Sequence, residues 1–121
     1  MKHEVFFDEA AAVLRMKIGG TLTPDEAEES FMLAKRLLED KKPRYILTDL
    51  SHHEGNLDKA TRQTLKEKGL DVDFDKQVLV GTSPVTRMMG KMIMAMLGKS
   101  KKTGFFGTEA AALTWLKGVR R

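Results

Sequence analysis

Side chains that could bind a ligand follow two apolar runs of the sequence, YILTDL and QVLV. They are Asp49, Ser51 and His52 near the first run, and Thr82, Ser83 and Arg87 after the second. In open α/β sheets, ligands bind beyond the carboxyl ends of the parallel strands. If both runs are parallel strands, these six residues meet at one edge of the sheet. The pattern therefore indicates a binding site for an anion or a small polar ligand.

The second of these loops begins a predicted helix at Ser83 and Pro84. Free N–H groups and the helix dipole favour negative charge at such a position, and Arg87 would add a positive charge. The alternative is that Thr82 and Ser83 only cap the helix while Arg87 lies in solvent. The sequence leaves both interpretations open.

Catalytic and metal chemistry are not favoured by the spacing of these residues. Asp49, Ser51 and His52 could be assembled into a hydrolytic triad, but neighbours on one loop seldom reach triad geometry, and Gly-x-Ser-x-Gly is absent. His52, His53 and Glu54 are adjacent, whereas paired metal ligands usually have helical spacing. The chain has no cysteine. We therefore expect no catalytic residue, no metal site and no cofactor.

The elements that position the two loops can be read from hydrophobic periodicity and from turn residues. Strands are predicted at 3–7, 12–18, 45–50, 77–80 and 104–106, and helices at 24–41, 58–68, 84–97 and after Thr108. Two strands followed by alternating helices and strands predict an α/β fold with a hairpin at its start. We expect a mixed, mostly parallel five-stranded sheet flanked by helices (β-β-α-β-α-β-α-β-α).

Length and composition indicate one globular domain over residues 1–121. Hydrophobic residues make up 41% of the chain and charged residues 31%. No apolar run approaches the ~20 residues that span a bilayer, and the N-terminus lacks an apolar signal core. We expect a cytoplasmic protein, with any peripheral contact made at the inner membrane face.

Charge is divided along the chain. Residues 1–75 carry a net charge of −4, whereas residues 76–121 carry +8 with Glu109 as their single acid. Such polarity steers a protein toward anionic surfaces, although it also fits charges that are simply solvated. Phe105 and Phe106 fit a strand core, and no nucleic-acid recognition motif is present, so we expect no nucleic-acid partner.

The helix predicted at 84–97 is unusually rich in methionine. On a 3.6-residue wheel, one face collects Val85, Met88, Met89, Met92, Ile93 and Met96. Ala95 and Leu97 widen this face to an arc of roughly 200°, more than burial on a core requires. Met94 is expected on the far side, near Arg87 and Lys91.

This apolar helix and the lysines around it form the strongest candidate surface. Its residues are Met88, Lys91, Met92, Met94, Leu97, Lys99, Lys101 and Lys102. Methionine suits adaptable apolar contacts, and lysine attracts anionic lipid headgroups. The helix could be a lid over an apolar pocket, a membrane contact, a homodimer contact, or a core helix whose methionines fill gaps.

Four stretches together resemble the SpoIIAA-like branch of the STAS fold, which is related to SEC14-type domains. They are IGGTLTPDEAEE, YILTDLS, KQVLVGTSPVTRMMGKM and GFFGTEAAALTWL. The resemblance implies a non-catalytic regulatory domain that binds a protein partner or a small ligand. The relation to SEC14-type domains implies, as an alternative, a peripheral membrane module or one that binds a lipid-like, apolar ligand.

The chain departs from this family at the serine that better-known anti-sigma-factor antagonists phosphorylate. In the corresponding stretch Asp58 is in place, but Lys59 and Ala60 replace the serines. Thr61 is one residue further on and is expected to face the core. We therefore expect no serine phospho-switch and no phosphorylation of Thr61.

Overall fold

The computed structural model describes residues 3–53, 58–69 and 72–118, and it confirms the predicted α/β fold. The strands are β1 (Glu4–Asp8), β2 (Val13–Lys17), β3 (Tyr45–Asp49), β4 (Lys76–Val80) and β5 (Thr103–Phe106). The helices are α1 (Pro24–Leu38), α2 (Lys59–Gly69), α3 (Pro84–Met96) and α4 (Glu109–Lys117), with a short 3-10 helix, η1 (Ser100–Lys102), before β5.

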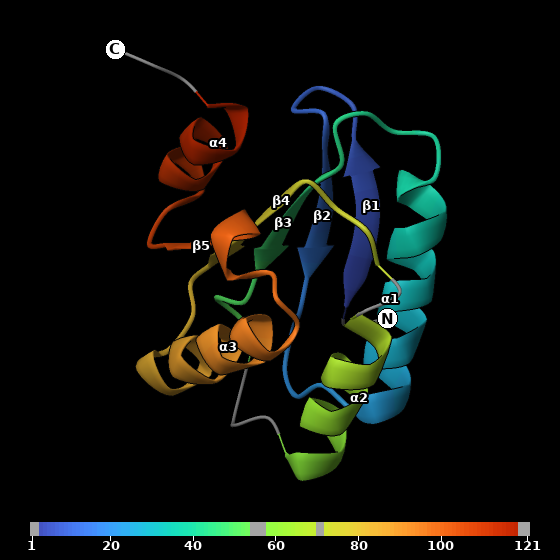
Figure 1. Cartoon of the computed structure of the whole chain (residues 1–121), viewed down its shortest axis with the longest axis vertical. Helices are drawn as coiled ribbons and strands as arrows, with labels where there is room; N and C mark the ends of the chain where they lie inside the picture. Colours follow the sequence, from blue (N-terminus) through green and yellow to red (C-terminus); the bar gives the residue numbers. More distant parts are fainter. Residues whose placement is uncertain (1–2, 54–57, 70–71, 119–121) are drawn as a thin grey trace.

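The five strands form one sheet in the order β1-β2-β3-β4-β5 (Figure 1). β1 and β2 are the predicted antiparallel hairpin, and the other three pairs are parallel. In the register, Ile46 lies between Leu14 of β2 and Gln77 of β4. The carboxyl ends of β3 and β4 therefore lie at the same edge of the sheet.

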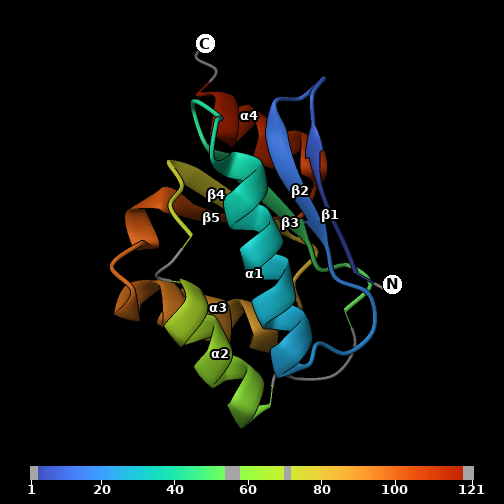
Figure 2. The same cartoon turned by 90° about the vertical axis from the view of Figure 1, so that its right-hand side faces the viewer.

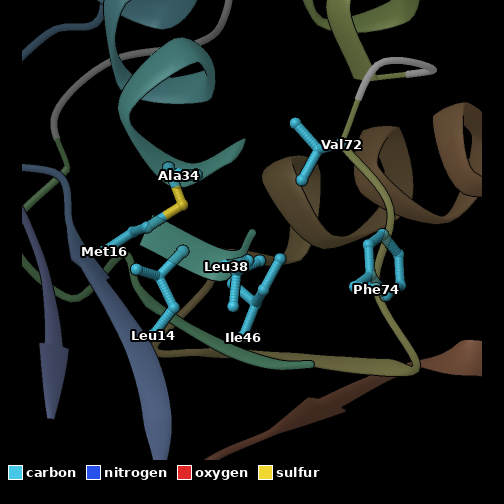
Figure 3. Close-up of a cluster of buried hydrophobic side chains, with 7 residues drawn as sticks. All are labelled: Leu14, Met16, Ala34, Leu38, Ile46, Val72 and Phe74. Atoms are coloured by element: carbon cyan, nitrogen blue, oxygen red, sulfur yellow. The ribbon is translucent and has the colours of Figure 1, made fainter. Parts of the chain in front are cut away.

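Helices cover both faces of the sheet, because apolar side chains alternate along the strands. α1 packs against β1 and β2 on one face, and α4 packs against β3, β4 and β5 on the other (Figure 2). The core on the α1 side contains Leu14, Met16, Ala34, Leu38, Ile46, Val72 and Phe74 (Figure 3). The core on the α4 side contains Val13, Leu47, Val78, Val80, Ala112 and Leu116.

The apolar face predicted for α3 is divided between solvent and the protein interior. Val85, Met88, Met92 and Met96 are exposed, at 47%, 61%, 60% and 66%. Of the six residues expected on one shared face, only Ile93 is buried. Met94, expected on the far side, points inward, with its Sδ 2.9 Å from Nε2 of Gln77.

The cause is a close approach between α3 and the last strand. A Cβ built on Gly90 would lie 3.1 Å from Cε2 of Phe105, so only a residue without a side chain fits there comfortably. Because of this contact, the side of α3 that carries Thr86, Gly90 and Ile93 faces the protein interior. The exposed stripe of α3 (Val85, Met88, Met92 and Met96) consequently faces outward.

The predicted capping box of α1 is present and extends to the start of the chain. Thr23 Oγ1 accepts from the amide of Glu26 (3.2 Å), and Glu26 Oε1 accepts from the amide of Thr23 (3.0 Å). The buried His3 ring accepts from the amide of Gly19 at Nδ1 and donates from Nε2 to Glu26 (3.0 Å). Donation by the Thr23 amide, and then by His3, lowers the pKa of Glu26 to about 2.

We predict that Glu26→Gln lowers the free energy of unfolding by about 1 kcal/mol at pH 7, the usual cost of a lost helix cap. Because the folded-state pKa lies below the ordinary value of 4.5, the carboxylate stabilises the fold above that pH and loses this effect as the pH falls toward 2. Urea unfolding at pH 7 and pH 3 should show a difference that shrinks on acidification. Glu29→Gln, at an exposed position of α1, is the control; an equal deficit of Glu26→Gln at both pH values would contradict the prediction.

Candidate functional site

A cavity of about 150 Å³ lies between the sheet and helices α1, α2 and α3. Leu79 and Phe105 line it from the sheet, and Ile93, Met94 and Leu97 line it from the α3 side. Its lining is almost entirely apolar. This cavity is the space to which the hypothesis of α3 as a lid would apply.

The cavity exists because α3 does not lie flat on the sheet as α1 and α4 do. Gly90 rests on the ring of Phe105, and α3 otherwise packs on α2 and η1. The Leu97 side chain reaches the end of α2, where a Cβ on Gly69 would lie 3.0 Å from Leu97 Cδ1. α3 therefore contacts Phe105 and its neighbouring helices, and a space remains between α3 and the strands.

Lys99 anchors the chain that follows the C-terminal end of α3. Its Nζ donates to the carbonyls of Gly69 and Val72, both at 2.9 Å, and lies 4.8 Å from the centre of the Phe74 ring. Burial, and secondarily the charge of Lys102, lowers the pKa of the Lys99 ammonium. Two of its three N–H groups thus donate to backbone carbonyls. Lys99 therefore connects α2 and the segment before β4 to the chain after α3, and we call this connection the Lys99 clamp.

A second, open depression lies at the carboxyl ends of β3 and β4. It brings together three residues that the sequence predicted for a ligand site, Ser51, Thr82 and Ser83. Gly81 makes this juxtaposition possible: it has φ 75°, and a Cβ on it would lie 2.8 Å from Cβ of Ser51. The other three predicted residues, Asp49, His52 and Arg87, do not line the depression.

The polar groups of these residues are largely used within the fold. Ser83 Oγ accepts from the amide of Thr86 (3.2 Å) and donates to Thr86 Oγ1 (3.1 Å), as a helix cap does. The Ser51 hydroxyl donates to Asp49 Oδ1 (2.6 Å). Burial works most strongly against ionisation of Asp49, but the hydrogen bonds from Ser51 and the nearby Lys17 together lower its pKa. The Arg87 guanidinium lies 5.9 Å from the Phe105 ring centre.

The sequence did not single out His53 for this site. His53 is half-buried, and its backbone pairs with Gly20 in an isolated bridge. His53 lines both the depression and the apolar cavity, whereas the neighbouring His52 is exposed and lines neither. Burial, and then the nearby His3, lowers the pKa of His53, which favours a neutral imidazole.

Two other sequence hypotheses concern metal binding and phosphorylation. Glu54 lies outside the described residues, and within the described ranges no three His, Asp or Glu side chains are grouped as a metal site. Thr61 is fully buried, as predicted, and its hydroxyl donates to the Leu22 carbonyl (3.1 Å). The Asp58 carboxylate accepts from the Thr61 amide (2.7 Å).

The residues predicted for a membrane or partner surface divide between two faces. Met88, Lys91, Met92 and Lys101 are exposed, whereas Met94, Leu97 and Lys99 line the cavity. Lys102 is half-buried, with Nζ 5.0 Å from the Phe74 ring centre. Among the helices of the described ranges, none has the length and apolar character needed to cross a bilayer.

Comparison with solved structures places this architecture among STAS-type folds. An uncharacterised protein with a SpoIIAA-like fold from Shewanella loihica PV-4 has a TM-score of 0.69 at 19% identity, covering 94% of this chain and 91% of its own. An anti-sigma-factor antagonist (STAS) domain protein from Planctomyces limnophilus has a TM-score of 0.62 at 16% identity, covering 94% and 96%. Comparison with curated proteins gives no match.

The sequence itself carries the family signal. Residues 13–117 match the SpoIIAA-like family, a span that includes both candidate sites. The fold is consistent with a non-catalytic regulatory domain. On this match, and in agreement with the resemblance seen in its motifs, the chain belongs to the SpoIIAA-like family.

Proposed function

We propose that this protein is a non-catalytic domain that binds a small apolar ligand in the cavity beneath α3. The observation that carries this proposal is the cavity of about 150 Å³ with an almost entirely apolar lining. An apolar space of this kind favours an apolar occupant over water, which needs polar partners.

The size of the cavity limits the ligand. An engineered protein cavity of about 150 Å³ binds benzene, so about six carbon atoms fit this space as it stands. At about 0.8 kcal/mol per buried CH₂, such a ligand gains about 5 kcal/mol. That corresponds to a dissociation constant on the order of 0.1 mM. Tighter binding requires a polar contact or a movement of α3 that enlarges the space.

α3 is suited to such a movement. Gly81 precedes it and Gly98 follows it, and both have positive φ (75° and 71°), where the backbone can turn without steric cost from a side chain. Met94 on its inner side is flexible enough to fit ligands of different shape. A ligand that moves α3 would also move its exposed stripe, so the helix could report occupancy to a protein partner.

The proposed regulation does not use a phosphorylated side chain in α2. Lys59 and Ala60 stand where the related antagonists have serines, and the Thr61 hydroxyl is buried and hydrogen-bonded to Leu22. A kinase would have to unfold the start of α2 to reach it. Ligand occupancy therefore takes the place of the phosphate in this proposal.

Binding in the cavity should be visible at individual methionine methyl groups. We predict that titration with benzene shifts the ¹³C-methyl signals of Met94 and Met16, which line the cavity, because the ring occupies the space beside them. Because benzene fits the cavity without a movement of α3, the signals of the exposed Met88, Met92 and Met96 should stay in place and serve as internal controls.

Filling the cavity should abolish this response. Leu79→Trp places a larger side chain in the lining, and we expect at least a tenfold loss of benzene affinity. Met32→Trp, at an exposed site on α1, is the matched control and should bind as the wild type does. Unchanged binding by Leu79→Trp, or shifts confined to the exposed methionines, would overturn the cavity assignment.

A second candidate function is contact with an anionic membrane, and the exposed stripe of α3 favours it. Met88, Met92 and Met96 are each at least 60% exposed. Lys91 and Lys101 are also exposed, and each lysine near a charged leaflet contributes roughly 1 kcal/mol. In this function the outer face of α3 binds the headgroup region, and its inner face still covers the cavity.

We predict that the protein co-sediments with phosphatidylglycerol vesicles at low salt and not with phosphatidylcholine vesicles. Met92→Glu should reduce binding at least fivefold, because it places a negative charge in the stripe, whereas Met32→Glu on α1 should have little effect. Absence of binding to anionic vesicles at low salt would eliminate this function. Sedimentation velocity without vesicles tests the homodimer alternative. A dimer formed through the exposed stripe would dissociate in Met92→Glu.

A further inference from the structure

The apolar cavity and the open depression are neighbours in the structure. Three residues line both of them: Leu50, His53 and Thr86. The two spaces therefore meet at these three residues. A molecule that extends past them has its inner part among apolar side chains and its outer part at the hydroxyls of Ser51 and Thr82.

Two of these three shared residues have polar side chains, His53 and Thr86, and within the described residues only the His53 side chain has no hydrogen bond. Leu50 is apolar, and Thr86 Oγ1 accepts a hydrogen bond from Ser83. The His53 imidazole makes no side-chain hydrogen bond in the part of the chain that the structure describes; its contact with Leu50 is made by its backbone amide. A half-buried imidazole without a partner, beside an apolar cavity, is suited to bind a polar group of the ligand.

The charges around the two spaces favour a ligand without a formal charge. None of the described residues that line the depression is a lysine, arginine, aspartate or glutamate. In the cavity the cation is Lys99, which lines it together with Gly69, Val72 and Phe74 and is held by the first two carbonyls. Within the described ranges, an anionic head at His53 would therefore lack a charged partner.

We propose that His53 recognises the hydroxyl of an uncharged, single-chain amphiphile whose tail of about six carbons fills the cavity. The hydroxyl donates its hydrogen to the unprotonated imidazole nitrogen at the junction of the two spaces. This inference rests on the proposed function of the cavity and adds to it the class of the ligand and its direction. The alcohol end faces the depression, and the methyl end lies beneath α3.

The probes that test this are 1-hexanol and its isomer methyl pentyl ether, which has the same number of atoms but no O–H group. A hydrogen bond that contributes about 1 kcal/mol corresponds to about a fivefold change in affinity. We expect the ratio of hexanol affinity to ether affinity to fall about fivefold in His53→Phe relative to the wild type. The different hydration of the two probes cancels in this comparison.

A control variant and a measurement of the ligand's orientation complete the test. His52→Phe changes the neighbouring, exposed histidine and should leave the ratio unchanged; a loss there, with none in His53→Phe, would overturn the proposal. In the wild type, the methylene group next to the hydroxyl should show nuclear Overhauser effects to the His53 ring, and the terminal methyl group to Met94. The reverse arrangement would also overturn it.

The outcomes separate this inference from the function on which it rests. If neither isomer shifts the Met94 methyl signal of the wild type, the apolar-ligand function fails and the role of His53 fails with it. If both isomers bind and the ratio is the same in the wild type and in His53→Phe, the cavity function stands and the role of His53 is wrong.

Discussion

The contact between Gly90 and the Phe105 ring determines how the second half of this chain is arranged. Elsewhere in the fold small residues bring helices onto the sheet: Ala34 of α1 and Ala112 of α4 are completely buried in the two cores. In α3 the small residue meets an aromatic ring that stands up from the last strand. The helix is therefore supported above the strands, and the space beside that support remains as a cavity. A bulkier residue at position 90 would have to displace the ring or the helix.

This arrangement explains why α3 is apolar on two sides. Ile93 and Met94 face the cavity, while Met88, Met92 and Met96 face outward, so neither side of the helix is closed by a tightly packed layer. A core helix is stabilised by burying one face fully. α3 instead depends on its contacts with α2 and η1 and on the Lys99 clamp. Few buried contacts permit movement, which is what a lid or an adaptable docking helix requires.

The sequence contained enough information for the architecture and for part of the site. Caps and prolines at Thr23, Ser83 and Thr108 mark helix starts by local hydrogen bonding, so these helices begin where predicted. Ser51 and Ser83 meet because parallel strands bring their carboxyl ends to one edge. The rotation of α3 could not be predicted, because an apolar arc of roughly 200° leaves the inward direction undecided. The position of His53 between the two spaces depends on contacts between segments far apart in the sequence, which hydrophobic periodicity does not predict.

The proposed function requires that a ligand can enter the apolar cavity between the sheet and α3. Xenon tests it most directly, since it binds dry apolar cavities without needing any polar contact. We expect crystals pressurised with xenon to show an anomalous peak between Leu79 and Ile93, with the methionines of the exposed stripe at the surface. A structure in which α3 lies flat on β4 and β5, with Met88 and Met92 enclosed and no xenon beneath the helix, would contradict it.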